Sequence, residues 1–224
     1  MSKLTSNLAN IKNQIAACSP SNHNVQLLAV SKTKPLDMIR EAYHSGQRLF
    51  GENYVQEAIE KIQSASDLTE IEWHLIGPLQ SNKTKQVAEH FDWVQSIDRF
   101  KIAQRLNDQR PDNLPVLNVC IQVNISNEAS KSGLTSEAVC ELAAQISALP
   151  NLRLRGIMAI PAKTKDEQEL DQAFSQLFEI YKNLQQEYSS VDTLSMGMSQ
   201  DMAQAIKNGS TMVRIGSAIF GQRT

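Results

Sequence analysis

The chain has 224 residues, 41% hydrophobic and 21% charged, a balance typical of a soluble globular domain. Its net charge of −2 gives no basic excess for nucleic acid, and no run approaches the ~18 apolar residues of a membrane span. Scattered cysteines and histidines match no zinc or disulfide spacing. We therefore expect one domain over residues 1–224, in the cytoplasm, without metal, membrane or nucleic acid.

Apolar runs that suit buried strands alternate with helical spacing along the chain. A stripe of Leu4, Leu8, Ile11 and Ile15 predicts a helix at the N-terminus. Strands are predicted at 26–31, 48–50, 72–76, 92–96, 116–124, 152–160, 193–195 and 212–215. A helix or turn signal follows each strand. Helix caps are predicted at Ser81, Asp98 and Ser199.

This alternation predicts parallel strands, because a helical crossover returns the chain to the same end of a sheet. Eight units favour closure into a (β/α)8 barrel, a TIM barrel, rather than a doubly wound open sheet. The last helix has room for only a few residues. We expect the additional N-terminal helix to cover the side that it leaves bare.

Unusual residues stand at the predicted carboxyl ends of the strands, where such barrels carry their chemistry. The candidate site residues are Lys32, Asn53, His74, Met158, Ser195, Ser199, Arg214, Gly216 and Ser217. Simpler interpretations exist for several of them. Lys32 or its neighbour Lys34 suits a solvated loop, Asn53 suits a helix N-cap, and His74 suits a hydrogen-bonded core position. For Arg214, within an apolar strand, a purely structural interpretation is the weakest, because a buried guanidinium needs an acceptor or a ligand.

Glycine and serine cluster after the seventh and eighth strands. Barrels often bind a phosphate with the backbone amides of these two loops. Gly197 permits close backbone approach, and Gly216 and Ser217 offer further amides. Turn formation alone explains either loop, but the two loops together favour a phosphate site.

Five blocks in order along the chain carry a resemblance. They are LAVSKTKP at 28–35, FGENYVQE at 50–57, WHLIGPLQSNK at 73–83, SMGMS at 195–199 and VRIG at 213–216. Together they resemble the pyridoxal phosphate homeostasis protein family. The resemblance implies a barrel like the N-terminal domain of alanine racemase, with pyridoxal 5′-phosphate (PLP) held as a Schiff base on Lys32. It also implies a monomer with a role in cofactor homeostasis.

The resemblance also implies residue roles. Ser199, Gly216 and Ser217 would hold the phosphate, with Ser195 as an alternative to Ser199. Arg214 would face the pyridine nitrogen, and Asn53 would lie near the ring.

Two functions from different classes remain open. A permanently charged Arg214 disfavours protonation of the pyridine nitrogen, which weakens the ring as an electron sink and argues against transamination, although racemisation could still work with a weak sink. Storage, buffering or delivery to PLP-dependent apo-enzymes would each suit a carrier. The alternative is a small amino-acid racemase or lyase. A two-base racemase needs a second acid–base group, which alanine racemase takes from a separate β-domain. The chain stops shortly after Ile215, so we expect that domain to be absent.

Overall fold

The computed structural model describes residues 2–20, 24–125, 133–162, 164 and 166–222. The strands are β1 Gln26–Val30, β2 Leu49–Glu52, β3 Glu72–Leu75, β4 Trp93–Ile97, β5 Leu117–Val123, β6 Leu152–Ala159, β7 Thr193–Ser195 and β8 Met212–Ile215. The α-helices are α1 Lys3–Cys18, α2 Leu36–His44, α3 Val55–Ser64, α4 Thr84–His90, α5 Phe100–Gln109, α6 Val139–Ser147, α7 Glu167–Glu187, α8 Met202–Lys207 and α9 Ser217–Phe220. Short 3₁₀ turns, η1 Ser81–Lys83 and η2 Ser136–Ala138, precede α4 and α6.

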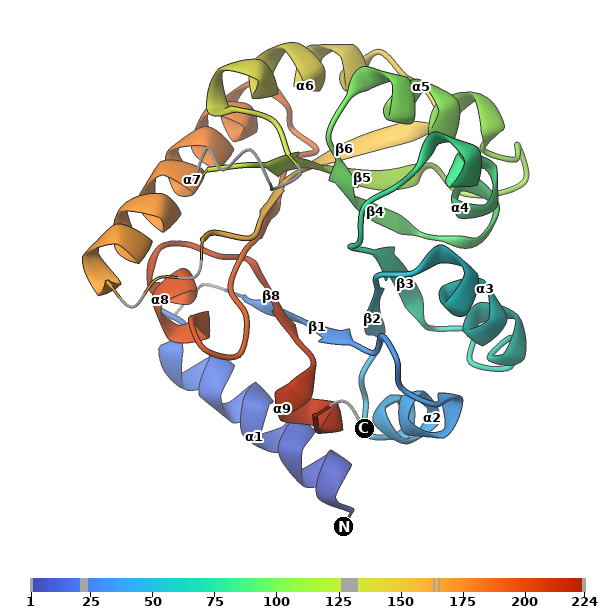
Figure 1. Cartoon of the computed structure of the whole chain (residues 1–224), viewed down its shortest axis with the longest axis vertical. Coiled ribbons are helices and arrows are strands. Elements are labelled where there is room, and N and C mark those ends of the chain that lie inside the picture. The colour runs from blue at the N-terminus through green and yellow to red at the C-terminus, as the bar shows by residue number, and fades with distance from the viewer. Residues whose placement is uncertain (1, 21–23, 126–132, 163, 165, 223–224) are drawn as a thin grey trace.

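The eight strands form a closed parallel barrel inside a ring of helices (Figure 1). Each strand pairs with the next, and β8 pairs with β1 in a register that sets Leu28 beside Arg214. Because β1 pairs with both β2 and β8, the sheet is closed at this seam. The predicted barrel is confirmed, and the alternative of an open sheet is wrong.

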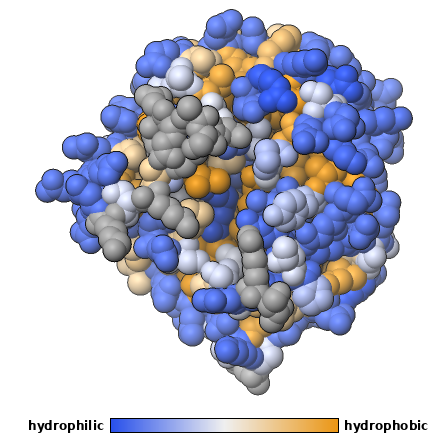
Figure 2. All heavy atoms as spheres, in the orientation of Figure 1, coloured by the Kyte–Doolittle hydropathy of each residue, from blue (hydrophilic) through white to orange (hydrophobic). Residues whose placement is uncertain are grey.

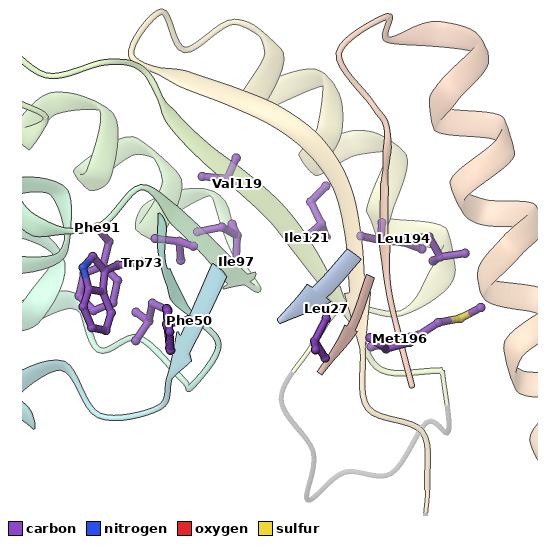
Figure 3. Close-up of a cluster of buried hydrophobic side chains, with 14 of the residues drawn as sticks. Leu27, Phe50, Trp73, Phe91, Ile97, Val119, Ile121, Leu194 and Met196 are labelled. Carbon is purple, nitrogen blue, oxygen red and sulfur yellow. The ribbon is translucent and has the colours of Figure 1, made fainter. Parts of the chain in front are cut away.

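Successive side chains along each strand point alternately into the barrel and outward toward the helices. The apolar side chains of the strands therefore form two layers. One set packs between strands and helices, and Figure 3 shows Phe50, Ile97, Ile121 and Leu194 among its buried members. Each such fully buried side chain contributes roughly 1.5–3 kcal/mol to stability. A separate cluster of Trp93, Cys120 and Met158 fills part of the barrel interior.

The last helix of the ring, α9, is only four residues long, and the N-terminal helix α1 covers the side of the barrel that α9 leaves bare. Its buried face carries the predicted stripe, from Leu4 to Ile15, and packs against α2, α8 and α9. The side chain of Asn7 donates a hydrogen bond to the Ile219 carbonyl at 3.1 Å. The expected covering role of this helix is confirmed.

Three predicted helix caps are wrong, because the side chain interacts with another group or the helix begins at a different residue. Ser81 begins η1, and its carbonyl accepts a bond from the Thr84 hydroxyl where α4 starts. Asp98 pairs with the Arg99 guanidinium at 2.7 Å and does not cap α5. Ser199 lies in a turn two residues before Asp201, which holds the N-cap position of α8.

The face of the molecule drawn in Figure 2 is mostly hydrophilic, with hydrophobic groups visible between the polar side chains. Among the residues that the structure describes, three large hydrophobic side chains are exposed, Tyr54, Phe100 and Ile160, and each lies just beyond the carboxyl end of a strand. Across the part of the chain that the structure describes, no helix combines the length and apolar character needed to cross a membrane.

Candidate functional site

Lys32 is half-buried in a tight turn directly after β1. The turn closes where the Lys34 backbone N–H donates to the Ser31 carbonyl at 3.1 Å. Thr33, between them, has a φ of 62°, in the left-handed region that a β-branched residue rarely occupies. Its N–H donates to Glu57 Oε1 at 2.5 Å. The backbone on the C-terminal side of Lys32 is therefore strained and held by a side chain from α3.

A buried charge cluster lies behind this turn. Glu52 is fully buried, and its Oε1 accepts bonds from the Ser31 hydroxyl at 2.7 Å and from Lys61 Nζ at 2.8 Å. Lys61 Nζ also donates to the Ser31 carbonyl at 2.8 Å and to Glu57 Oε1 at 2.6 Å. Burial raises the pKa of Glu52, and the Lys61 ammonium opposes that rise. The sequence analysis did not identify these residues; the i,i+4 spacing of Glu57 and Lys61 was the one visible signal.

Arg214 stands on β8, beside β1, and is almost completely buried. Its Nη1 donates to the Ser195 carbonyl at 2.6 Å and to the Ser195 hydroxyl at 2.7 Å, while Nη2 donates to the Ala159 carbonyl at 2.8 Å. Burial lowers the pKa of Arg214 to about 10, so the guanidinium stays charged at neutral pH. These acceptors fix the plane of the guanidinium across β6, β7 and β8.

The hydrogen bonds continue from Arg214 into the barrel in one direction. Because Arg214 can only donate, the Ser195 hydroxyl gives its proton to Gln95 Oε1, at 2.7 Å. Gln95 Nε2 then faces His74 Nδ1 at 2.9 Å, so Nδ1 accepts and Nε2 carries the ring proton. His74 stacks on Trp93 with ring centroids 4.9 Å apart. Burial lowers the pKa of His74 to about 3, which keeps the ring neutral.

Two predicted residues leave buried polar atoms without a hydrogen-bond partner among the described residues. These atoms are His74 Nε2 and Asn53 Oδ1. Asn53 does not cap α3, because the N-cap position belongs to Tyr54, so the simpler interpretation of Asn53 is wrong. A Cβ on Gly77 would lie 2.1 Å from the Asn53 carbonyl oxygen, so the Asn53 backbone rests directly on that glycine. Unpaired buried polar atoms are costly unless a ligand or water satisfies them.

The loops after β7 and β8 are tied together by backbone contacts. The Arg214 N–H donates to the Gly197 carbonyl at 3.0 Å. Gly197 has a φ of 95°, and a Cβ there would lie 2.6 Å from the Ala205 Cβ, so glycine is required on both counts. A Cβ on Gly216 would lie 3.0 Å from the Val30 carbonyl oxygen, which sets this loop against the end of β1. Ser199 is exposed on the loop after β7, and Ser217 is exposed at the first position of α9.

The structure brings some predicted residues together and leaves others apart. Ser195 and Arg214 bond directly, and His74 joins them through Gln95, which the sequence analysis did not single out. Met158 pairs in register with Ser195 and is fully buried below the rim. No described hydrogen bond joins Ser199 or Ser217 to this network.

Two features lie outside the site. The Lys34 ammonium donates to the Gln222 carbonyl at 2.7 Å, which directs it toward the C-terminal segment. A surface cleft of about 500 Å³ lies beside α1, near the amino ends of β1 and β2. Its lining includes Lys12, Gln26 and Arg48 and none of the predicted site residues.

The fold and its lysine-bearing rim define a class of protein, the alanine racemase N-terminal domain, whose family model matches residues 1–224. The chain is 56% identical to the pyridoxal phosphate homeostasis protein of Vibrio alginolyticus over 230 residues, covering 100% of this chain and 99% of the relative. It is 54% identical to that of Escherichia coli K12, with 100% and 98% covered. The chain therefore belongs to the pyridoxal phosphate homeostasis protein family, and the resemblance drawn from the sequence is confirmed.

Solved structures agree with this assignment. PipY of Synechococcus elongatus PCC7942, solved without PLP, superimposes with a TM-score of 0.89 at 38% identity, covering 98% of this chain and all of PipY. The structure of PipY with PLP bound gives a TM-score of 0.86 at 37% identity, with the same coverage.

Proposed function

We propose that this protein binds PLP as a Schiff base on Lys32 at the carboxyl end of the barrel. We propose further that it stores, buffers or delivers the cofactor without catalytic turnover. The observation that carries the proposal is the pairing of β1 with β8, since it puts the Lys32 turn and the buried Arg214 on neighbouring strands. The PLP-bound relative supports the choice of cofactor.

The residues present fit PLP chemically. Bound PLP supplies an aldehyde for the lysine amine and an electron-withdrawing pyridine ring. Asn53 Oδ1 and His74 Nε2 are buried polar atoms that lack a partner among the described residues, as expected for groups beside a ligand. Arg214 would face the ring nitrogen with a donor, and Met158 would lie below the ring.

The phosphate has its own candidate residues, on the loops after β7 and β8. We assign its oxygens to the exposed hydroxyls of Ser199 and Ser217 and to the backbone of Gly216. Ser195, the alternative to Ser199, is fully buried and already engages Arg214 and Gln95. These contacts favour a role for Ser195 in holding Arg214 instead of the phosphate.

The charge on Arg214 favours a carrier over an enzyme. A guanidinium that stays protonated at neutral pH disfavours a second positive charge on the adjacent pyridine nitrogen. The ring then withdraws electrons weakly, so carbanions at the amino-acid Cα gain little stabilisation. The alternative, a small racemase or lyase, predicts sustained exchange of the Cα hydrogen when the loaded protein meets amino acids in deuterated water. A carrier predicts loss of cofactor to the amino acid and no sustained exchange.

The central test locates the attachment. Purified protein loaded with PLP should absorb in the visible range, and borohydride should fix the label on the peptide that contains Lys32. Lys32→Ala should abolish the label and keep the fold, because this half-buried turn lysine contributes little packing. Lys34→Ala is the matched control and should label normally. A wild-type label on any other lysine would overturn the assignment.

We also propose the setting in which the carrier works. It would be a cytoplasmic monomer whose single domain spans residues 1–224, and its recipients would be PLP-dependent apo-enzymes. Light scattering of the loaded protein tests the monomer. Transfer of labelled PLP to an apo-enzyme, measured against free PLP at the same concentration, tests delivery.

A further inference from the structure

We propose that Glu57, Glu52 and Lys61 act as positioning residues that hold the Lys32 turn in the shape required for reaction with an aldehyde. The inference rests on the proposed attachment of PLP to Lys32 and extends it to residues that do not touch the cofactor.

The contacts converge on both neighbours of Lys32. On one side, Ser31 is held through its hydroxyl by Glu52 and through its carbonyl by Lys61. On the other side, the Thr33 N–H is held by Glu57. The cluster thus fixes the residues immediately before and after the lysine.

The cluster also joins three separate elements. Glu52 ends β2, Glu57 and Lys61 lie one turn apart on α3, and the turn follows β1. Lys61 Nζ makes three bonds of 2.6–2.8 Å, one to each carboxylate and one to Ser31, which suits the three protons of an ammonium. An arrangement with all ammonium protons assigned has one preferred geometry, so it can define the position of the turn.

The strain at Thr33 identifies what the cluster holds in place. A threonine at φ 62° returns to negative φ unless its surroundings prevent it. The Glu57 contact to the Thr33 N–H opposes that return, and relaxation would move Lys32, the adjacent residue. Glycine adopts this φ without cost, so a glycine at position 33 needs the Glu57 contact less.

The test measures how fast PLP forms its borohydride-reducible adduct under stopped-flow mixing. Glu57→Ala should slow adduct formation by about 10- to 100-fold, since misplacing a reacting group by about 1 Å can cost up to about 100-fold in rate. Glu57→Gln keeps the acceptor oxygen and should fall between Ala and wild type. Glu60→Gln, an exposed glutamate on the same helix, is the matched control and should react at the wild-type rate.

The decisive variant adds Thr33→Gly to Glu57→Ala. If the cluster holds a strained turn, the double variant recovers a large part of the lost rate, because the turn no longer needs holding. A wild-type rate for Glu57→Ala, or slow reaction that Thr33→Gly does not relieve, would overturn the proposal. A wild-type label outside Lys32 would instead refute the proposed function, so the two failures are distinguishable.

Discussion

Replacing Arg214 with Gln tests the charge that we place at the pyridine nitrogen. The guanidinium donates three hydrogen bonds, to the Ser195 carbonyl and hydroxyl and to the Ala159 carbonyl. A glutamine cannot reach all three, and each buried acceptor that loses its donor costs about 1–3 kcal/mol. Removing a buried cation offsets part of this cost. We expect a net loss of about 2–4 kcal/mol, or roughly 5–15 °C in Tm for a chain of this size.

The functional consequence is measured on the loaded variant. With a neutral side chain beside it, the pyridine nitrogen can take a proton, and the ring becomes a stronger electron sink. Arg214→Gln should therefore gain slow Cα hydrogen exchange with amino acids in deuterated water, followed by NMR. Glutamine serves better than glutamate, because a carboxylate would face the Ser195 and Ala159 carbonyl oxygens. Arg153→Gln, at an exposed arginine on β6, is the control.

One result would refute this placement. If Arg214→Gln loses the expected stability and binds PLP, yet shows an unchanged visible spectrum and no exchange, the guanidinium does not face the ring nitrogen. Its role would then be contact with the phosphate, a common use of arginine.

Three further predictions concern other parts of the site. Ser199→Ala should weaken PLP binding roughly 10- to 100-fold and leave unphosphorylated pyridoxal unaffected in fluorescence titrations, and equal losses would contradict the phosphate role. Gly197→Ala should lower the urea midpoint, because φ is 95° and Ala205 lies too close; an unchanged midpoint would refute this. His74 stays neutral in the folded state down to about pH 3 but protonates near pH 6.5 when unfolded, so stability falls as pH decreases through that window. Urea unfolding should lose about 2 kcal/mol more between pH 7.5 and 5 in wild type than in His74→Gln, and equal losses would contradict the burial effect.

The fold followed from the sequence because its signals are repeated and local. Each strand is a short apolar run, and each predicted strand region overlaps one in the structure, although β2 and β4 extend beyond the predicted ends at 50 and 96. Helix caps were predicted poorly because they depend on contacts beyond the local pattern. Asp201 takes the N-cap position of α8 and accepts a bond from the Met198 N–H at 2.5 Å, and nothing in the local sequence favoured it over Ser199.

Candidate site residues could be proposed from the sequence only where a residue contradicts its surroundings. A lysine after an apolar strand and an arginine within one stand out, so Lys32 and Arg214 became candidates. Glu52 resembles an ordinary polar residue at a strand end, and Lys61 resembles a solvated residue on an amphipathic helix. Their connection to Ser31 depends on the register of β1 against β2, which pairs Val30 with Gly51. That register is a tertiary property that a single sequence does not reveal.

The hydrogen-bond chain behind Arg214 bears on the choice between carrier and racemase. A racemase must remove a proton from one face of Cα and return one from the other, so its groups must change protonation state. Within this hydrogen-bond network Arg214 keeps its proton at neutral pH, and His74, with a pKa of about 3, does not take one at that pH. Ser195 and Gln95 between them have their donors and acceptors set by the arginine. Such a network fixes a charge and moves no proton, which supports the proposed carrier over the alternative racemase.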